Sequence, residues 1–227
     1  MEKLLVCSCV AYDPYSNGMA YLLDNYADTV KKGVEKYAEM RGASDIIYLL
    51  PEGSKSYGLG KEAFSMTLPA LDNPFAVAQV LVGNLPRPMI ADDYVAVYEG
   101  KEVLVLTPDA AYVIATGTMD QFVTVNKGGV SEVKKAAYNS KLGALVDLSD
   151  AKAVLVGGLK GRFVTPAEAA EIPVTGETPS VTVYGKEACM VCELAKIQAQ
   201  TWQNSCGKCV LCREGTLQCK AMVEDMP

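Results

Sequence analysis

The first fifty residues carry three patterns in succession: the apolar run LLVCSCVA at residues 4–11, the amphipathic stretch AYLLDNYADTVKKGVEKYAEMR at residues 20–41, and the apolar run IIYLL at residues 46–50. In the middle stretch, apolar residues recur every three or four positions with lysines and glutamates between them, which predicts a helix ending near Gly42. The two flanking runs are short and continuous, as is typical of buried strands. A strand, a helix and a strand in this order predict an α/β fold for the N-terminal part of the chain.

The residues that follow are expected to complete this first α/β unit, which we place at residues 1–117. Four prolines between residues 69 and 88 surround a short predicted helix at 74–82. Beyond them, three short apolar or alternating runs are expected to be strands, at 94–98, 103–106 and 112–115.

A second part, residues 118–180, shows a different arrangement. It is expected to contain a strand, a turn at two glycines, a helix and another strand, at 121–125, 127–129, 131–138 and 153–156. This succession predicts a small β-grasp-like module. The proline- and glycine-containing segment 172–180 is the predicted linker to a cysteine-rich third part, residues 181–227, in which 193–203 is expected to be helical.

Composition excludes several classes of function. Lysine and arginine number 21 against 27 acidic residues, a net charge of −6, so the chain lacks the positive field that attracts nucleic-acid phosphates. No apolar stretch approaches the roughly 18 to 20 residues that cross a bilayer, and the N-terminus lacks the features of an export signal. We therefore expect a cytoplasmic protein with reduced cysteines. The sequence has no histidine, so any metal would be bound by thiolates or carboxylates.

Six of the eight cysteines lie between residues 189 and 219. Three of them, Cys206, Cys209 and Cys212, follow one another at CxxC spacing in a loop that contains Gly207. Such a loop can direct three thiolates toward the irons of one cubane cluster, and glycine allows its backbone to approach the cluster sulfides closely. The spacing therefore predicts an iron-sulfur site. The alternative that these cysteines are only buried small apolar residues fits poorly with their regular spacing in a polar loop.

The other cysteines have several possible roles. Cys189 and Cys192 form a further CxxC pair, and two such pairs can bind one zinc ion, so zinc is the competing metal. The segment between the pairs is shorter than in most zinc ribbons, and its predicted helix would hold them about 20 Å apart. Cys189 and Cys192 are otherwise alternative ligands of the cluster, part of a second metal site, or packing residues. Cys7 and Cys9 alternate on a predicted strand and are expected to be structural.

The residues around the CxxCxxC loop resemble a known family. The string SCGKCVLCREGT at 205–216 is similar to the cluster-binding signature of the NADH- and flavin-binding subunit of complex I and of its relatives in NAD-linked hydrogenases and formate dehydrogenases. The family has a proline where Leu211 stands, and the other positions match closely. The resemblance implies that Cys206, Cys209 and Cys212 hold a [4Fe-4S] cluster. Upstream, AKAVLVGGLKG at 151–161 resembles the glycine turn of the family's β-grasp (SLBB) domain, so the resemblance covers about residues 118–220.

The chain also departs from this family. The family's glycine-rich flavin and NADH loop is not found in residues 1–117, which resemble at most a shortened flavin domain, so we expect no FMN and no NAD on this chain. The nearest substitute, GLGKEA at 58–63, lacks a convincing ribose-binding acid and is expected to be a turn that starts a helix. Cys219 is the nearest replacement for the family's more distant fourth cluster ligand. It lies seven residues beyond Cys212, about 10 Å away on a continuous helix, so this assignment needs a break at Gly215.

These features together predict an electron-transfer subunit. Its cluster would relay single electrons within a soluble, multisubunit, NAD(P)-linked oxidoreductase, with electron bifurcation as one option. The expected partners are flavin- or NAD(P)-binding and other iron-sulfur subunits of the same complex, and no catalytic residue is assigned to this chain. The alternative is a scaffold subunit whose C-terminal segment is stapled by zinc without redox chemistry. A stand-alone flavin- or NAD-dependent enzyme would need a nucleotide site that the sequence does not show.

Overall fold

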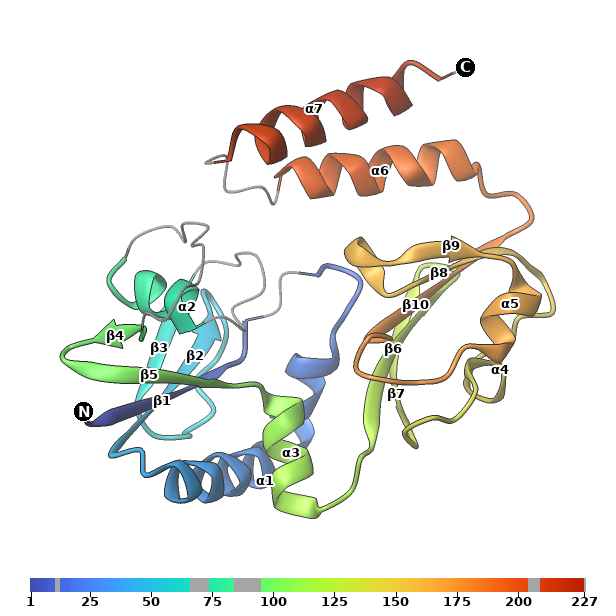
Figure 1. Ribbon diagram of the computed structural model, residues 1–227. Helices are drawn as coiled ribbons and strands as arrows, with labels where there is room; N and C mark the ends of the chain where they lie inside the picture. The colour runs from blue at the N-terminus through green and yellow to red at the C-terminus, as the bar shows by residue number, and fades with distance from the viewer. Residues whose placement is uncertain (11–12, 66–73, 84–94, 204–208, 227) are drawn as a thin grey trace. The chain divides into compact units, whose positions relative to one another are not determined.

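The computed structural model describes residues 1–10, 13–65, 74–83, 95–203 and 209–226. These residues form two compact units, each with its own five-stranded sheet (Figure 1). Most of the first unit lies before Met119, and the second contains residues 13–18 together with most of the chain from Met119 onward. Helices and strands are mixed in both units, which confirms the predicted α/β class.

The sheet of the first unit has the strand order β3-β2-β1-β5-β4, and only the edge strand β4 is antiparallel to its neighbour. Helices cover both of its faces, as in doubly wound folds. The strands are β1 (Lys3–Ser8), β2 (Asp45–Pro51), β3 (Glu62–Ser65), β4 (Val97–Tyr98) and β5 (Lys101–Leu106). The helices are α1 (Gly18–Arg41), α2 (Pro74–Leu81) and α3 (Pro108–Thr116).

Burial explains why the N-terminal apolar run forms the central strand. In β1, Leu5, Val6 and Cys7 are completely buried, because α2 covers one face of the sheet and α1 with α3 covers the other (Figure 1). On the first face, Val77 of α2 packs against a cluster that includes Leu4, Val6, Ile47, Leu49 and Val103. A strand buried on both faces needs a continuous apolar run, and this is what residues 4–10 supply.

The structure confirms some of the predicted elements of this unit and corrects others. The predictions of β1, α1, β2, α2 and β5 are confirmed. Residues 112–115, predicted as a strand, lie instead in helix α3, which starts at Pro108 and ends at Gly117 in a left-handed C-cap. The expected helix start at 58–63 is also wrong, because Glu62–Ser65 is strand β3, paired in parallel with β2. Both segments are too short for sequence periodicity to distinguish a helix from a strand.

The sheet of the second unit has the order β7-β6-β10-β8-β9. Its first and last strands, β6 and β10, lie side by side in parallel, and all other neighbours are antiparallel. This is the arrangement of a β-grasp sheet, as predicted. The strands are β6 (Gln121–Lys127), β7 (Val130–Ala136), β8 (Ala151–Val156), β9 (Arg162–Val164) and β10 (Ser180–Gly185), and the short helices between them are α4 (Leu142–Leu145), the 3-10 turn η1 (Gly158–Lys160) and α5 (Pro166–Glu171).

Two sequence-based expectations for the second unit need correction. The helix predicted at 131–138 is strand β7, because Gly128 and Gly129 both have positive φ (61° and 79°) and form the tight turn of a hairpin. The predicted boundary between residues 180 and 181 falls at the start of β10, a central strand that pairs with both β6 and β8. The sheet therefore extends to Gly185.

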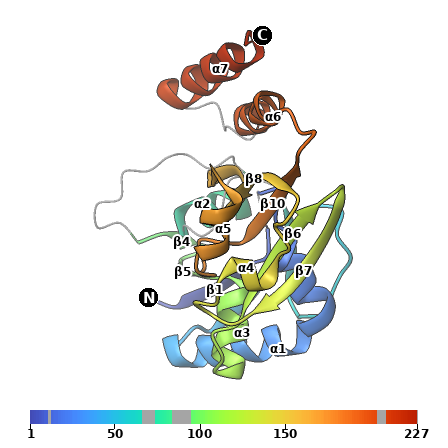
Figure 2. The same cartoon turned by 90° about the vertical axis from the view of Figure 1, so that its right-hand side faces the viewer.

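Two helices follow the second sheet and belong to the same unit: α6 (Met190–Gln203) and α7 (Val210–Glu224). The helix predicted at 193–203 is thus confirmed as part of α6. Side chains along β8 point alternately to the two faces of the sheet. Val154 and Val156 contribute to the core on the face of α4 and α5, whereas Leu155 packs with Tyr184 of β10 and Ile197 of α6 on the other face. Helices α6 and α7 lie side by side in both views (Figures 1 and 2). Among the described helices, none combines the length and the apolar character needed to span a bilayer.

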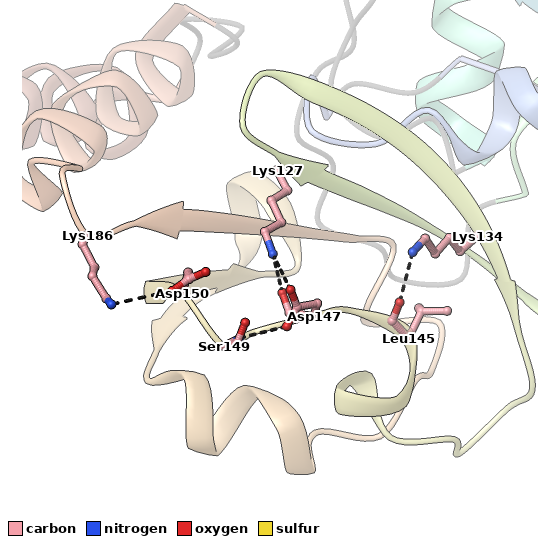
Figure 3. A network of polar contacts seen from close by, with 7 residues as sticks. All are labelled: Lys127, Lys134, Leu145, Asp147, Ser149, Asp150 and Lys186. Carbon is pink, nitrogen blue, oxygen red and sulfur yellow. Dashed lines mark hydrogen bonds and ion pairs between the residues drawn. The ribbon is translucent and has the colours of Figure 1, made fainter.

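Polar contacts hold the loop between α4 and β8 in place (Figure 3). The Lys127 ammonium of β6 donates to the main-chain oxygen and to the carboxylate of Asp147, over 2.8 and 3.1 Å. The backbone N–H of Ser149 donates to the same carboxylate over 3.1 Å. These contacts lower the pKa of Asp147 from its ordinary value of 3.8 to about 2, with the largest effect from the Ser149 hydrogen bonds and a smaller one from Lys127.

We expect the stabilising contribution of the Asp147 carboxylate to disappear in acid. Because its pKa is lower in the folded protein than in the unfolded chain, the contribution is complete above the unfolded value and is lost as the pH falls from 3.8 to about 2. The measurement is urea unfolding of the wild type and of Asp147→Asn at about pH 5 and about pH 2. The wild type should lose more stability between the two conditions than the variant, and an equal loss would contradict the prediction.

Candidate metal centre

The described C-terminal cysteines lie at three places on α6 and α7. Cys189 and Cys192 stand at the start of α6, Cys209 immediately precedes α7 with Cys212 in its first turn, and Cys219 lies in its second half. Cys206 lies outside the described residues. None of the described cysteines is in a disulfide, and all of these are exposed except Cys209, which is half-buried.

The start of α7 brings Cys209 and Cys212 to the same end of one helix. A residue just before a helix and the residue three positions later lie close together, as in a capping box. The backbone N–H groups of the first turn have no partner within the helix, and they give this end a partial positive charge that attracts anionic groups. Two of the three predicted cluster ligands therefore lie where an anionic group is stabilised.

Leu211 shows why the one mismatch to the cluster signature is compatible with this geometry. It is the second residue of α7, and its side chain is 90% exposed. Proline is tolerated in the first turn of a helix because the N–H groups there have no helical acceptor. A leucine at this position adopts the same helical backbone, so the exchange leaves the start of α7 unchanged.

Cys219 is not brought to Cys212. Helix α7 is continuous from Val210 to Glu224, and the Thr216 hydroxyl donates to the main-chain oxygen of Cys212 across Gly215, over 2.7 Å. Seven residues of α-helix separate Cys212 from Cys219 by about 10 Å along the axis. Cys219 could be the fourth cluster ligand only if the helix broke at Gly215, and the described helix α7 has no such break.

Cys189 and Cys192 lie at the end of α6 that is remote from the predicted cluster loop. The 14 residues of α6 span about 20 Å, so a single zinc ion cannot join this pair to cysteines that directly follow Gln203. The Cys189 sulfur accepts a hydrogen bond from the Cys192 thiol and another from the Cys192 backbone N–H, at an N···S distance of 3.5 Å. Both hydrogen bonds lower the pKa of Cys189, and the one from the Cys192 thiol has the larger effect.

A lysine that no sequence pattern indicated lies beside this pair. The Lys152 ammonium on β8 donates to the main-chain oxygen of Ala188 over 2.7 Å, and its charge also favours the Cys189 thiolate. Nothing in the sequence links two residues so far apart; only the β8–β10 pairing does. In the part of the chain that the structure describes, no group of three or more Cys, Asp or Glu side chains is placed to hold a metal ion.

Cys7 and Cys9 are buried in the first unit, with their sulfur atoms 3.9 Å apart. The contact with Cys9 and burial both raise the pKa of Cys7, so its thiol stays protonated. A buried pair of cysteines agrees with the structural role expected for these residues.

Comparisons with known proteins identify the fold. Neither a protein-family model nor a curated protein matches this sequence. Two crystal structures of an NAD+-reducing [NiFe]-hydrogenase contain a chain of similar fold, one in the air-oxidized state (TM-score 0.85) and one in the H2-reduced state (TM-score 0.83). In both, identity is 19%, and the match covers 98% of this chain and 47% of the hydrogenase chain. The protein thus spans about half the length of these chains and shares the fold of that part.

Proposed function

We propose that this chain is an electron-transfer subunit of a multisubunit NAD(P)-linked oxidoreductase and holds a [4Fe-4S] cluster on Cys206, Cys209 and Cys212. The position of Cys209 and Cys212 at the start of α7, within the cluster signature, is the observation that carries the proposal. When bound, such a cluster accepts and donates one electron at a time.

The donor set fits this group. Thiolates are the ligands that iron-sulfur clusters require, and without histidine the chain offers no mixed imidazole site. Cys209 and Cys212 lie at the start of α7, and the exposed Cys212 leaves this end of the helix accessible to a partner. We assign these residues to binding and tuning and assign no catalytic residue to the chain.

The remaining parts of the proposal concern organisation and partners. We propose that residues 118–180, extended by β10, form an SLBB module, that residues 1–117 are a flavin-domain relative without FMN or NAD, and that the protein acts in the cytoplasm. Its partners would be flavin- or NAD(P)-binding and other iron-sulfur subunits. The fold shared with chains of an NAD+-reducing hydrogenase supports this setting. The net charge of −6 argues against nucleic acid as a partner.

A zinc-stapled scaffold is the second candidate function. The two CxxC pairs on either side of α6 favour it, because together they supply four cysteines. The length of α6 opposes it, since zinc ligands must converge within about 2.3 Å of one ion.

Metal analysis of anaerobically purified protein, with electron paramagnetic resonance after dithionite reduction, tests the proposal. We expect about four irons per chain and the signal of a reduced cluster. Iron content should be unchanged in Cys189→Ser, which would remove a ligand from the zinc site. If the protein instead contains one zinc per chain and no iron, and if Cys189→Ser loses that zinc, the relay function is refuted and the scaffold function is supported.

A further inference from the structure

The CxxC pair at the start of α6 has a geometry that the proposed cluster does not use. Cys189 precedes the first residue of the helix and Cys192 lies in its first turn, and both side chains are exposed. The Cys189 sulfur accepts the Cys192 backbone N–H at 3.5 Å, and the main-chain oxygen next to it, of Ala188, is held by Lys152. The Cys189 sulfur thus accepts hydrogen bonds from the backbone N–H and the thiol of Cys192, and the Lys152 ammonium is bound to the residue before it.

A metal does not account for this pair. Two thiols are half of a zinc or cluster donor set, and among the described residues no third Cys, Asp or Glu side chain joins them. The helix between this pair and Gln203 is fixed to the second sheet through Ile197, which packs with Leu155 and Tyr184. The length of α6 therefore separates the pair from the cysteines at the start of α7.

We propose that Cys189 and Cys192 form a reversible dithiol–disulfide pair that reacts with low-molecular-weight disulfides, with Cys189 as the attacking thiol and Cys192 as the resolving thiol. Residues three apart at the start of a helix have the Cα separation that a disulfide requires, so the bond can form without displacing α6. A thiolate at a helix N-terminus with a second cysteine in the first turn is a reactive arrangement.

The small disulfide is the oxidant in this reaction. The Cys189 thiolate attacks one sulfur of the disulfide RS–SR, forming a Cys189–SR mixed disulfide and releasing RS⁻. Cys192 then gives up its proton and attacks the Cys189 sulfur, so that the Cys189–SR bond breaks and a second RS⁻ leaves. The pair loses two hydrogens in total, and the oxidant is reduced to two thiols.

Tryptic digestion separates every cysteine that matters for the test. Glu187–Lys196 contains Cys189 and Cys192 alone, Cys209–Arg213 contains two predicted cluster ligands, and Glu214–Lys220 contains only Cys219. Cys219 is exposed on α7 away from the helix start, so it is an internal reference for an ordinary surface thiol.

The experiment treats the anaerobically purified, cluster-loaded protein with glutathione disulfide, alkylates the remaining thiols and identifies the peptides by mass spectrometry. In the wild type, 187–196 should lose two hydrogens. In Cys192→Ser, glutathione should remain attached to Cys189. The rate at which glutathione becomes attached to Cys189 should be about threefold or more above its rate of attachment to Cys219. Cys189→Ser should form neither product quickly, and its serine is a favourable cap, so α6 should still start at the same place.

Two results would overturn the inference: glutathione attached to 187–196 in the wild type without an internal disulfide, or a Cys189 that reacts no faster than Cys219. Peptide 209–213 is read in the same digest and reports the cluster separately. If the cluster is absent, that peptide becomes alkylated, while the result for 187–196 still decides the inference.

Discussion

Replacement of Cys209 with serine is expected to reduce the iron content of the purified protein from about four atoms per chain to nearly none. A serine hydroxyl stays protonated near neutral pH and is a poor ligand for iron in a cluster that thiolates assemble. Serine is also a preferred residue immediately before a helix, so α7 should form as in the wild type. Iron and sulfide analysis measures the loss, and far-UV circular dichroism verifies that helix content is unchanged.

Cys219→Ser is the matched control for this prediction, because it makes the same chemical change about three turns further along the same helix. We expect it to retain the iron, since α7 is continuous across Gly215. A loss of iron in Cys219→Ser would show that α7 opens on cluster binding and that Cys219 is the fourth ligand. Full iron content in Cys209→Ser would refute the assignment of Cys209.

Substitution of Gly33 by alanine is expected to destabilise the first unit by about 1–3 kcal/mol or more. Gly33 lies in α1, where an added Cβ would be only 1.9 Å from the main-chain oxygen of Ala111 in α3. The obstacle is backbone, which cannot move without shifting the whole helix, and α3 is also tied to α1 by Lys36, whose ammonium donates to Ile114 O over 3.2 Å. Calorimetry should show a lower unfolding temperature.

Gly215→Ala is the corresponding control. Gly215 lies within α7, and an added Cβ there meets nothing within 4 Å. Alanine has a higher helix propensity than glycine, so this variant should be more stable by about 0.5–1 kcal/mol. The same chemical change therefore has opposite expected signs at the two positions. A stabilised Gly33→Ala would mean that α1 and α3 are not in contact at this point.

Periodicity predicted the long helix α1 and the central strands β1, β2 and β5 correctly, and it failed on several other short segments. Helix α1 has 24 residues, and its apolar spacing is visible without any tertiary contact. Residues 112–115 are apolar in either a strand or a helix; here Pro108 and Gly117 bound a helix with Ala111 and Tyr112 on its buried side. Residues 131–138 mix apolar and charged side chains without a pattern that distinguishes a helix from a strand, and the conformation of β7 follows from its pairing with β6 after the Gly128–Gly129 turn.

The candidate site was predictable to a similar degree. The CxxCxxC spacing predicts the proposed ligands Cys206, Cys209 and Cys212, because ligand spacing is a local property of the sequence. Whether Cys219 can join them depends on an intact helix across Gly215, which the sequence left undecided. The position of Lys152 near Cys189 depends on the sheet that brings β8 beside β10.

The amino-acid sequence alone determined the α/β class, the long helix α1 with its flanking strands and the order of the cysteines, because each of these depends on neighbouring residues in the chain. Tertiary structure alone decided the conformation of the short segments, the inclusion of residues 13–18 in the second unit and the surroundings of each cysteine pair. In segments of a few residues, local preferences are weak compared with the hydrogen bonds and burial that distant strands and helices provide.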